Sequence, residues 1–367
     1  MTAAIAPRLL RWAKRHGRHD LPWQRRSGSR NRIAYRVWVA EIMLQQTQVA
    51  TVIPYFQRFM RAFPSVRALA DAPLDDVLAH WSGLGYYARA RNLHRAARLV
   101  RDEHRGRLPT QRAPLETLPG IGRSTAAAIV AQTDGQPEAI LDGNVKRVLA
   151  RYHAVPGWPG ETAVARQLWT LAEQETPQRD VAAYTQAIMD LGATVCTRRR
   201  PGCETCPLAG DCQAYAAGRV GDYPGARPQR QKPQRRRVFA VLWNNAGKIM
   251  LTRRAPTGIW GGLWCLPEWP DEASCRDWLA GYGLTGTAEP LAPIEHAFTH
   301  FRLQLVPLQA VIRRPRRVAD AASGDWYSLD AALRLGLPAP IRSLLASLQT
   351  QQQENQDGAH GALRKTG

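Results

Sequence analysis

Four cysteines lie close together in the middle of the chain, and this cluster constrains the fold more than any other sequence feature. The spacing is Cys196-x6-Cys203-x2-Cys206-x5-Cys212. A zinc site usually pairs two short Cys-x2-Cys knuckles, whereas only Cys203 and Cys206 form one here. Unevenly spaced thiolates in one compact loop suit an iron–sulfur cubane, in which each iron takes one sulfur. The spacing therefore favours an iron–sulfur cluster, with zinc and unliganded thiols as the alternatives.

The charge balance predicts a polyanionic partner. The chain of 367 residues has 50 Lys and Arg against 30 Asp and Glu, a formal charge of +20. Nucleic acid is the commonest partner of so basic a protein. No apolar run approaches the roughly 18–20 residues that span a bilayer, and the N-terminus lacks a secretory signal. We therefore expect a cytoplasmic protein without a membrane partner, in which Cys265 and Cys275 are buried or free.

A chain of this length is expected to form two or three domains. Apolar residues at three- and four-residue spacing predict a helical region over 1–217. Residues 218–236 are rich in Pro, Gly and Arg and predict an extended basic linker. An Asn-Asn-Ala-Gly turn between apolar runs then predicts a smaller α/β domain over 237–347, and the Gln-rich tail 348–367 is expected to be disordered. The helices expected in the first region are Val37–Met60 with a break at Pro54, Leu74–Trp81, Ala88–Arg101, Ser124–Gln132, Val145–Tyr152, Glu161–Glu175 and Val181–Leu191.

The segment Leu118-Pro-Gly-Ile-Gly122 joins two short helical patterns. Glycine at 120 and 122 would let the backbone adopt positive φ and approach a ligand closely. The helix that follows offers free N–H groups and a positive dipole end to an anion. These features predict a helix–hairpin–helix that holds a DNA phosphate, and a simple turn is the alternative.

Two carboxylates stand in contexts that matter for chemistry. Glu41 has Val37, Trp38 and Leu44 as helical neighbours, so poor solvation is expected to raise its pKa and keep it protonated near neutrality. A protonated carboxyl can act as a general acid, although Glu41 could instead reach an Arg partner. Asp142 directly precedes an expected helix, where Asp is usually an N-cap. The local sequence predicts that cap and leaves a catalytic role open.

Several motifs occur together in this chain. They are WVAEIMLQQTQVATVIPYF over 38–56, GLGYYARARN over 83–92, LPGIG over 118–122 and LDGNVKRVL over 141–149. With the cysteine spacing, they resemble the MutY-type adenine DNA glycosylases, which belong to the helix–hairpin–helix/endonuclease III superfamily. The resemblance covers roughly residues 5–345.

The resemblance implies a reaction and a cofactor. The family flips adenine out of the duplex, because chemistry on a stacked base is impossible. By position, Glu41 would protonate the adenine and handle the incoming water, and Asp142 would remain ionised beside the developing sugar cation. Asn144 would support the sugar and Asp142 by hydrogen bonding. The resemblance also implies that the four cysteines hold a 4Fe–4S cluster.

The resemblance further implies contacts with duplex DNA that contains adenine opposite 8-oxoguanine or guanine. Gln46 and Tyr86 match residues that wedge into the duplex, and the hairpin would grip the backbone. Arg198 and Arg199 form a basic finger between the first two cysteines, whose natural use is a phosphate contact. The expected DNA-binding residues are Gln46, Tyr86, Gly120, Gly122, Arg123, Ser124, Arg198, Arg199, Phe298, Thr299 and His300.

One position separates related activities. Endonuclease III-type relatives carry a lysine nucleophile two residues after the second hairpin glycine, where this chain has Ser124. We therefore expect a monofunctional glycosylase. A bifunctional glycosylase/lyase that acts on oxidised pyrimidines and a non-catalytic cluster protein are the alternatives.

The C-terminal domain resembles a Nudix fold through Gly258–Glu268, but the metal-binding helix of Nudix hydrolases does not follow. Independent pyrophosphatase activity is therefore not expected. Phe298-Thr299-His300 stands where the family usually has Phe-Ser-His, which probes 8-oxoguanine. The expected fold is a mainly α helix–hairpin–helix body with an iron–sulfur loop, followed by an α/β Nudix-like domain. The body would comprise a six-helix module at about 28–136 and an iron–sulfur module made of the N-terminal helix and residues 137–217. We expect a monomer that is associated with the bacterial nucleoid.

Overall fold

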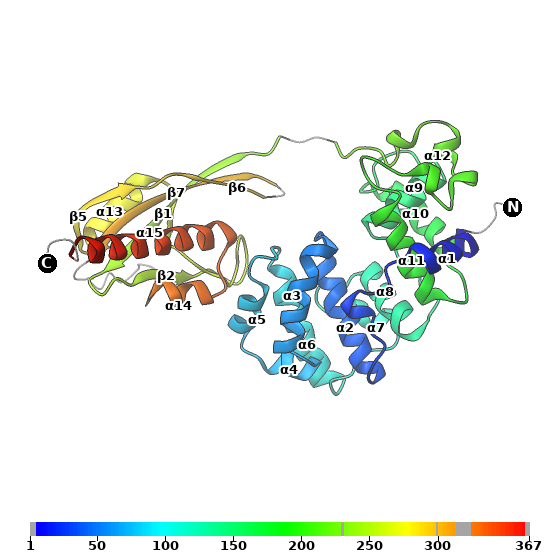
Figure 1. Cartoon of the computed structure of the whole chain (residues 1–367), viewed down its shortest axis with the longest axis horizontal. Helices are drawn as coiled ribbons and strands as arrows, with labels where there is room; N and C mark the ends of the chain where they lie inside the picture. Colours follow the sequence, from blue (N-terminus) through cyan, green and yellow to red (C-terminus); the bar gives the residue numbers. More distant parts are fainter. Residues whose placement is uncertain (1–4, 229–230, 299, 313–323, 364–367) are drawn as a thin grey trace. The chain divides into compact units, whose positions relative to one another are not determined.

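The computed structural model describes residues 5–228, 231–298, 300–312 and 324–363 and divides into two compact units (Figure 1). The helical unit comprises residues 1–71 and 92–229, and the sheet unit comprises residues 72–91 and 230–367. Among the described residues, every β-strand belongs to the sheet unit. No described helix is long and apolar enough to span a membrane. The expected class, a helical body followed by an α/β domain, is confirmed.

The helical unit consists of short helices joined by tight turns, and most of the predicted helices are found close to their expected bounds. Helix α6 begins in the sheet unit and continues into the helical unit from Asn92. The helices are α1 (Ile5–His16), α2 (Arg30–Leu44), α3 (Val49–Ala62), α4 (Val66–Asp71), α6 (Ala88–Glu103), α7 (Arg112–Glu116), α8 (Arg123–Asp134), α9 (Gly143–Tyr152), α10 (Thr162–Glu175), α11 (Val181–Thr194) and α12 (Gln213–Ala216), with 3-10 turns at Pro22–Gln24, Cys203–Thr205, Ala209–Asp211 and Val220–Asp222.

Helix α2 lies at the centre of one core. Its residues from Ala34 to Val39 are all buried, which is typical of a helix surrounded by protein on every side. Helix α8 packs directly against α2, and its residues Ala126–Gln132 are all buried. A polar group on the face where these two helices meet is largely shielded from water.

The break in the first long apolar stretch differs from the prediction. It falls at residues 45–48, between α2 and α3, and not at Pro54, which lies inside α3. Gln46 adopts a left-handed φ of 60°, which is incompatible with continuing a right-handed helix. Proline removes one N–H hydrogen bond near the start of α3, and the flanking buried residues Val52, Phe56 and Phe59 still hold that helix in place.

Helices α1, α9, α10 and α11 form the second core of the helical unit, and the cysteine loop packs against its edge. Helices α9 and α11 approach closely at Gly192. An added Cβ at Gly192 would lie 2.6 Å from the Cβ of Asn144 and 3.1 Å from its Cα. Asp190, two residues earlier on α11, is fully buried and pairs with Arg18 at 2.6 Å. This core therefore fixes the start of α9, where the predicted site residues lie.

The sheet unit contains one mixed sheet whose longest strands, β1 and β7, run parallel. Their register runs from Gln234 opposite Arg302 to Asn244 opposite Ile312. The main strand order is β3-β2-β1-β7-β5, and the predicted Asn-Asn-Ala-Gly hairpin joins β1 to β2. The strands are β1 (Gln234–Asn244), β2 (Ile249–Arg253), β3 (Trp264–Cys265), β4 (Glu268–Trp269), β5 (Leu284–Pro290), β6 (Ile294–Ala297), β7 (Arg302–Ile312) and β8 (Gly324–Tyr327), and the helices are α5 (Leu74–Trp81), α13 (Glu272–Tyr282), α14 (Leu329–Arg334) and α15 (Ala339–Leu363).

Both faces of the sheet are covered. Val238, Ala240 and Leu242 of β1 share a core with Cys275 and Leu279 of α13. Alternate residues of a strand point to opposite faces, so the buried residues between them require cover on the other side. Figure 1 shows α15 running across the sheet.

Three features differ from the sequence expectations. Residues 72–91 group with the sheet unit, so the expected module 28–136 is not one compact body. The expected linker 218–236 is held in its first half, where Gly225 N donates to Gly157 O at 2.9 Å, and its last residues form the start of strand β1 from Gln234.

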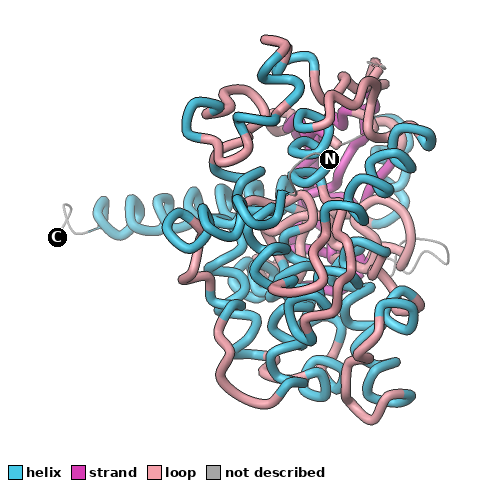
Figure 2. The backbone as a smooth tube through the Cα atoms, turned by 90° about the vertical axis from the view of Figure 1, so that its right-hand side faces the viewer, coloured by secondary structure: helices cyan, strands magenta, loops and turns pink. Residues whose placement is uncertain are grey.

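The tail that was expected to be disordered instead continues helix α15 through Leu363 (Figure 2). Gln, Ala and Leu propagate a helix once packed residues such as Ile341 and Leu345 have nucleated it.

The close contact between α9 and α11 leads to a stability prediction. Gly192→Ala should lower the free energy of unfolding by about 1–3 kcal/mol, because the new methyl group meets backbone atoms that cannot move aside. Urea unfolding of the full chain, followed by helical circular dichroism, measures the change. The matched control is Gly221→Ala, where the added carbon meets nothing within 4 Å. Equal stabilities of the two variants would contradict the prediction.

Candidate active site

The helical unit contains a broad cavity of about 1020 Å³. It is lined by α2, the turn after α2, the start of α8, the segment before α9, and one face of α11. Glu41 and Asp142 both line it. The structure therefore brings together two carboxyl groups that are 101 positions apart in the sequence.

Glu41 is half-buried on α2 and has one clear hydrogen-bond partner. Gln132 Nε2 of α8 donates to Glu41 Oε1 at 3.0 Å. Burial raises the pKa of Glu41 to about 7, the bond from Gln132 opposes that rise, and the negative charge of Asp142 adds to it. The direction is the one that the apolar neighbours predicted. The described partner of Glu41 is thus a glutamine rather than the arginine that the alternative required.

Gln132 is a site residue that sequence reasoning missed. It is buried at 6% exposure near the end of α8, among Ala, Ile and Val residues. Arg26 Nη1 donates to its main-chain carbonyl. A buried amide needs hydrogen-bond partners, and Glu41 provides one. The signal in the sequence was a glutamine that directly follows the apolar run Ala126–Ala131, but nothing in the sequence told which side chain it meets.

Asp142 is the N-cap of α9, as the local sequence predicted. Its Oδ1 accepts from Val145 N at 2.8 Å. Burial raises the pKa of Asp142, whereas the amides of Val145 and Asn144 and the positive charges of Arg147 and Lys146 oppose the rise. Four influences therefore favour the anion of Asp142, compared with the single hydrogen bond that favours the anion of Glu41.

Asn144, one residue into α9, is held by Arg147. Arg147 Nη2 donates to Asn144 Oδ1 at 2.8 Å and to Gly192 O at 2.6 Å. The same guanidinium donates through Nε to Cys196 O at 2.7 Å. Arg147 thus connects the cavity side of α9 to the first cysteine of the loop.

Ser124 lies in the cavity wall at the start of α8. Its Oγ accepts from Leu141 N at 3.0 Å. This bond fixes the main chain one residue before Asp142. The residue that replaces the lysine of the related lyases therefore has a positioning contact with the segment that carries Asp142.

The predicted hairpin connects α7 to α8. Gly120 has a φ of +81°, and an added Cβ there would lie 2.9 Å from the Cβ of Asn92. Gly122 has an extended φ of −94° and serves as the N-cap of α8, so the expectation of a positive φ at this position is wrong. An extended conformation at an N-cap leaves the first N–H groups of the helix without helical partners, as the prediction of an anion site requires.

Arg123 is engaged within the helical unit. Its Nη2 donates to Glu173, and its guanidinium lies 3.9 Å from the ring centroid of Trp169. Both partners belong to α10. The side chain of this predicted DNA contact is therefore stacked and paired, while its main-chain N–H lies in the first turn of α8.

Gln46 and Tyr86, the two predicted wedge residues, share an unusual geometry. Gln46 has a φ of 60° and Tyr86 a φ of 51°, and both are exposed, Tyr86 at 49%. Left-handed backbone at a non-glycine residue costs about 1–3 kcal/mol and concentrates at functional sites. Both side chains are therefore exposed to solvent and lie on turns with strained backbone.

Asp190 organises two further polar side chains of the cavity. Its carboxylate accepts from Arg18 N at 2.8 Å, from Arg18 Nε at 2.8 Å and from Gln186 Nε2 at 2.7 Å. Arg18 and Gln186 both line the cavity. Sequence reasoning missed both residues, because they come from separate helical regions that only the second core brings together.

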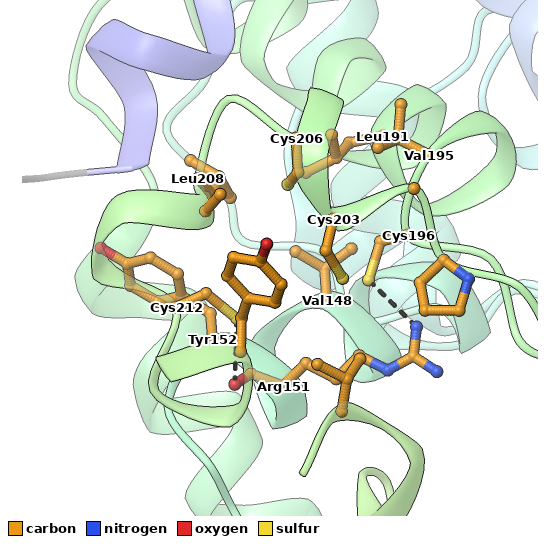
Figure 3. Close-up of a pocket in the computed structure, with 15 residues that line it drawn as sticks. Val148, Arg151, Tyr152, Leu191, Val195, Cys196, Cys203, Cys206, Leu208 and Cys212 are labelled. Carbon is orange, nitrogen blue, oxygen red and sulfur yellow. Dashed lines mark hydrogen bonds between the residues drawn. The ribbon is translucent and has the colours of Figure 1, made fainter. Parts of the chain in front are cut away.

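The four predicted metal-ligating cysteines surround one small pocket of the helical unit (Figure 3). Cys196, Cys203, Cys206 and Cys212 are all unpaired and half-buried. Burial and the neighbouring thiolates raise the pKa of Cys206 to about 11, although the amide of Leu208 opposes this. Thiols that are disfavoured as isolated anions require a cation nearby to become ligands.

Arg151 is a buried residue of α9 that fixes the cysteine loop. Its Nη1 donates to Cys196 Sγ at 3.3 Å and to Thr197 O at 2.7 Å, and its Nη2 donates to Arg198 O at 3.2 Å. The side chains of Arg198 and Arg199 are exposed. The basic finger is therefore held by its carbonyl groups and leaves its guanidinium groups outside.

The predicted 8-oxoguanine probe lies after β6 in the sheet unit. Phe298 stacks on Phe301 at 4.5 Å and lies 5.4 Å from Trp260, while His300 is exposed. Thr299 lies outside the described residues. The turn is thus supported by a cluster of three aromatic side chains, Phe298, Phe301 and Trp260. The contact with Trp260 was not predicted from the sequence.

Known proteins place this site in a family. Residues 39–174 match the HhH-GPD superfamily of base excision DNA repair proteins, and residues 238–347 match the NUDIX domain. The chain is 36% identical to the adenine DNA glycosylase of Buchnera aphidicola subsp. Acyrthosiphon pisum over 354 residues, 95% of this chain and 99% of the relative. It is 39% identical to the adenine DNA glycosylase of Mus musculus, over 94% of this chain and 64% of the mouse protein.

A solved structure of a thermostable thymine-DNA glycosylase matches 58% of this chain and 95% of its own, with 26% identity and a TM-score of 0.50. The sequence relatives extend over both units, and the two carboxyl groups, the hairpin and the cysteine loop lie inside the matched region. The chain therefore belongs to the adenine DNA glycosylases, enzymes of base excision repair.

Proposed function

We propose that this glycosylase hydrolyses the N-glycosidic bond of adenine opposite 8-oxoguanine or guanine in duplex DNA, without lyase activity. The observation that carries the proposal is the pair of carboxyl groups in one cavity, each with different neighbours. Burial raises the pKa of both groups, but only Asp142 has two backbone amides and two cationic side chains that oppose the rise. Two carboxyl groups in different surroundings can divide acid chemistry from charge stabilisation, as in glycoside hydrolysis.

Glu41 is the general acid in this proposal. Protonation of a ring nitrogen turns adenine into a better leaving group, and a carboxyl with a pKa of about 7 still holds its proton at neutral pH. After the bond breaks, the same carboxylate can accept a proton from the attacking water. Gln132 holds the carboxyl in place during both steps through its bond to Oε1.

Asp142 stabilises the positive charge that develops on the deoxyribose. Its capping bond to Val145 N fixes the carboxylate before the base enters, so no reorganisation is needed during the reaction. Asn144, in the first turn of α9, supports the sugar, and Arg147 fixes the amide of Asn144. Ser124 binds the main chain before Asp142 and has no amine to form a Schiff base, which supports a monofunctional reaction.

The cavity also supplies groups that could bind an extruded base. Arg18 and Gln186 present donors that Asp190 has already oriented, so their order is largely fixed before the base arrives. Leu44 and Ile140 add apolar surface. A planar base with hydrogen-bonding edges fits such a lining, since base flipping needs both stacking surface and polar contacts.

We propose that Cys196, Cys203, Cys206 and Cys212 hold a 4Fe–4S cluster. The four cysteines line one pocket, and their spacing in the sequence is uneven. A cubane distributes four thiolates over four irons, which suits such a loop. The donor from Arg151 to Cys196 Sγ also suits an anionic sulfur. When bound, the cluster would cross-link the loop that carries Arg198 and Arg199.

Duplex DNA is the proposed partner of a monomeric enzyme. The hairpin at Gly120 and Gly122 and the first turn of α8 at Arg123 and Ser124 would bind one phosphate, and Arg198 and Arg199 another. Gln46 and Tyr86 would wedge into the duplex at the mispair. Phe298, Thr299 and His300 would probe the 8-oxoguanine opposite the extruded adenine.

The role of Asp142 is tested by Asp142→Asn. The amide retains the shape of the side chain and one oxygen for the helix cap, but it removes the negative charge. Adenine release in single-turnover assays should fall by more than about 100-fold, while affinity for the A·8-oxoG duplex changes little. Full activity of this variant would exclude the proposed role.

The role of Glu41 is tested by pH. The single-turnover rate should decline as the pH rises above about 7, because the acid loses its proton, and Glu41→Gln should be inactive at every pH. Gln132→Met removes the bond that favours the Glu41 anion, so the pKa should rise and the alkaline decline should move to higher pH. A decline at the same pH in both proteins would assign the titration to another group.

A further inference from the structure

Residues 72–91 lie within the glycosylase sequence but pack with the sheet unit. Arg253 of β2 pairs with Asp75 of α5 at 2.5 Å, and Arg91 Nη1 donates to Gly261 O at 2.5 Å. Gly336 lies against α5 so closely that an added Cβ would be 3.0 Å from the Cβ of Leu78. The Nudix-like chain therefore contacts this segment at several points along its length.

The central contact is one main-chain carbonyl. Leu337 is fully buried, and its oxygen accepts from Tyr87 Oη at 2.8 Å and from Ser82 Oγ at 3.3 Å. Tyr87 Oη in turn accepts from Gly83 N at 3.3 Å. The two hydroxyl groups stand at the two ends of residues 82–87, which we call the Tyr86 loop.

Arg342 of α15 fixes the carbonyl from the other side. Its Nη1 donates to Leu333 O at 2.6 Å and its Nη2 to Leu335 O at 2.7 Å, so it secures the chain that leads from α14 to Leu337. Its Nε donates to Ser82 Oγ at 3.1 Å. A single planar guanidinium therefore joins this turn of the Nudix-like chain to the Tyr86 loop, which a lysine could not reproduce.

The Tyr86 loop has a conformation that needs external support. Gly83, Gly85 and Tyr86 all have positive φ, at 96°, 76° and 51°. Trp81 Nε1 and Arg89 Nη2 both donate to Gly85 O at 3.1 Å, and the Arg89 guanidinium lies 5.3 Å from the Tyr86 ring centroid. A strained backbone conformation persists only when surrounding contacts hold it in place. For the Tyr86 loop, many of these contacts come from Leu337 and Arg342.

We propose that the Nudix-like domain has a second role besides the 8-oxoguanine probe. Through the carbonyl of Leu337, it sets the conformation of the loop that presents Tyr86 to DNA. Ser82, Tyr87 and Arg342 are then positioning residues for the wedge. The inference rests on the proposed function, in which Tyr86 enters the duplex. It also implies that loss of the C-terminal domain would impair the wedge as well as the 8-oxoguanine probe.

The test uses the full-length protein with Tyr87→Phe, Ser82→Ala and Arg342→Lys. The matched controls are Tyr327→Phe, which removes another hydroxyl of the sheet unit, and Arg334→Lys, at an exposed arginine that ends α14. Hydrogen exchange of the 82–87 amides in the free protein should accelerate about 3- to 10-fold in the three variants only, as expected for loss of one or two hydrogen bonds. The melting temperature is measured alongside, and Ser82→Ala remains informative if a larger change unfolds the protein.

The functional arm measures affinity for a duplex with 8-oxoguanine opposite a non-hydrolysable adenine nucleotide. The dissociation constant should rise about 3- to 10-fold in the three variants and remain unchanged in the controls. Unchanged exchange of the loop would overturn the anchoring, and faster exchange with unchanged affinity would overturn its link to DNA. Failure of the unaltered protein to excise adenine would instead refute the proposed function, and the exchange result in free protein would still stand.

Discussion

The interaction on which the site depends is the burial of Glu41 between α2 and α8. A carboxylate that loses water without gaining a cation retains its proton, and here the described polar partner is the neutral amide of Gln132. The packing of α8 against α2, whose residues Ala34–Ala40 are all buried, creates that surrounding. The same packing places the start of α8, with Ser124, beside the segment that leads to Asp142. The packing of α2 against α8 therefore both stabilises the core and raises the pKa of Glu41.

Helix α9 connects the chemistry to the cysteine loop. Its first residues carry Asp142 as the cap and Asn144, its second turn carries Arg147, and its third carries Arg151. Residues four apart lie on one helical face, so both arginines reach the same loop with donors for its carbonyl groups and for Cys196. A helix that is rigid over three turns transmits the position of the loop to the carboxylate at its start. The cysteine loop and the cavity are therefore joined through one helix.

Much of the architecture follows from local sequence. Helix spans such as Leu74–Trp81, the hairpin after β1 and the N-cap at Asp142 depend on periodicity, turn residues and caps, which act over a few residues. The expectations that differ involve longer-range effects. Residues 72–91 join the sheet unit because of contacts with residues near Leu337, and the tail is helical because packing at its start offsets its weak apolar content.

The sequence by itself determined which chemical groups are present: two carboxyls in shielded or capped contexts, four cysteines in one loop, a glycine hairpin, and serine in place of a lysine nucleophile. Only the tertiary structure decided which groups meet. Gln132 on Glu41, Arg18 on Asp190, and Arg151 on Cys196 all join residues more than about 40 positions apart. The physical reason is that desolvation and hydrogen-bond geometry depend on distances in space, which local periodicity does not encode.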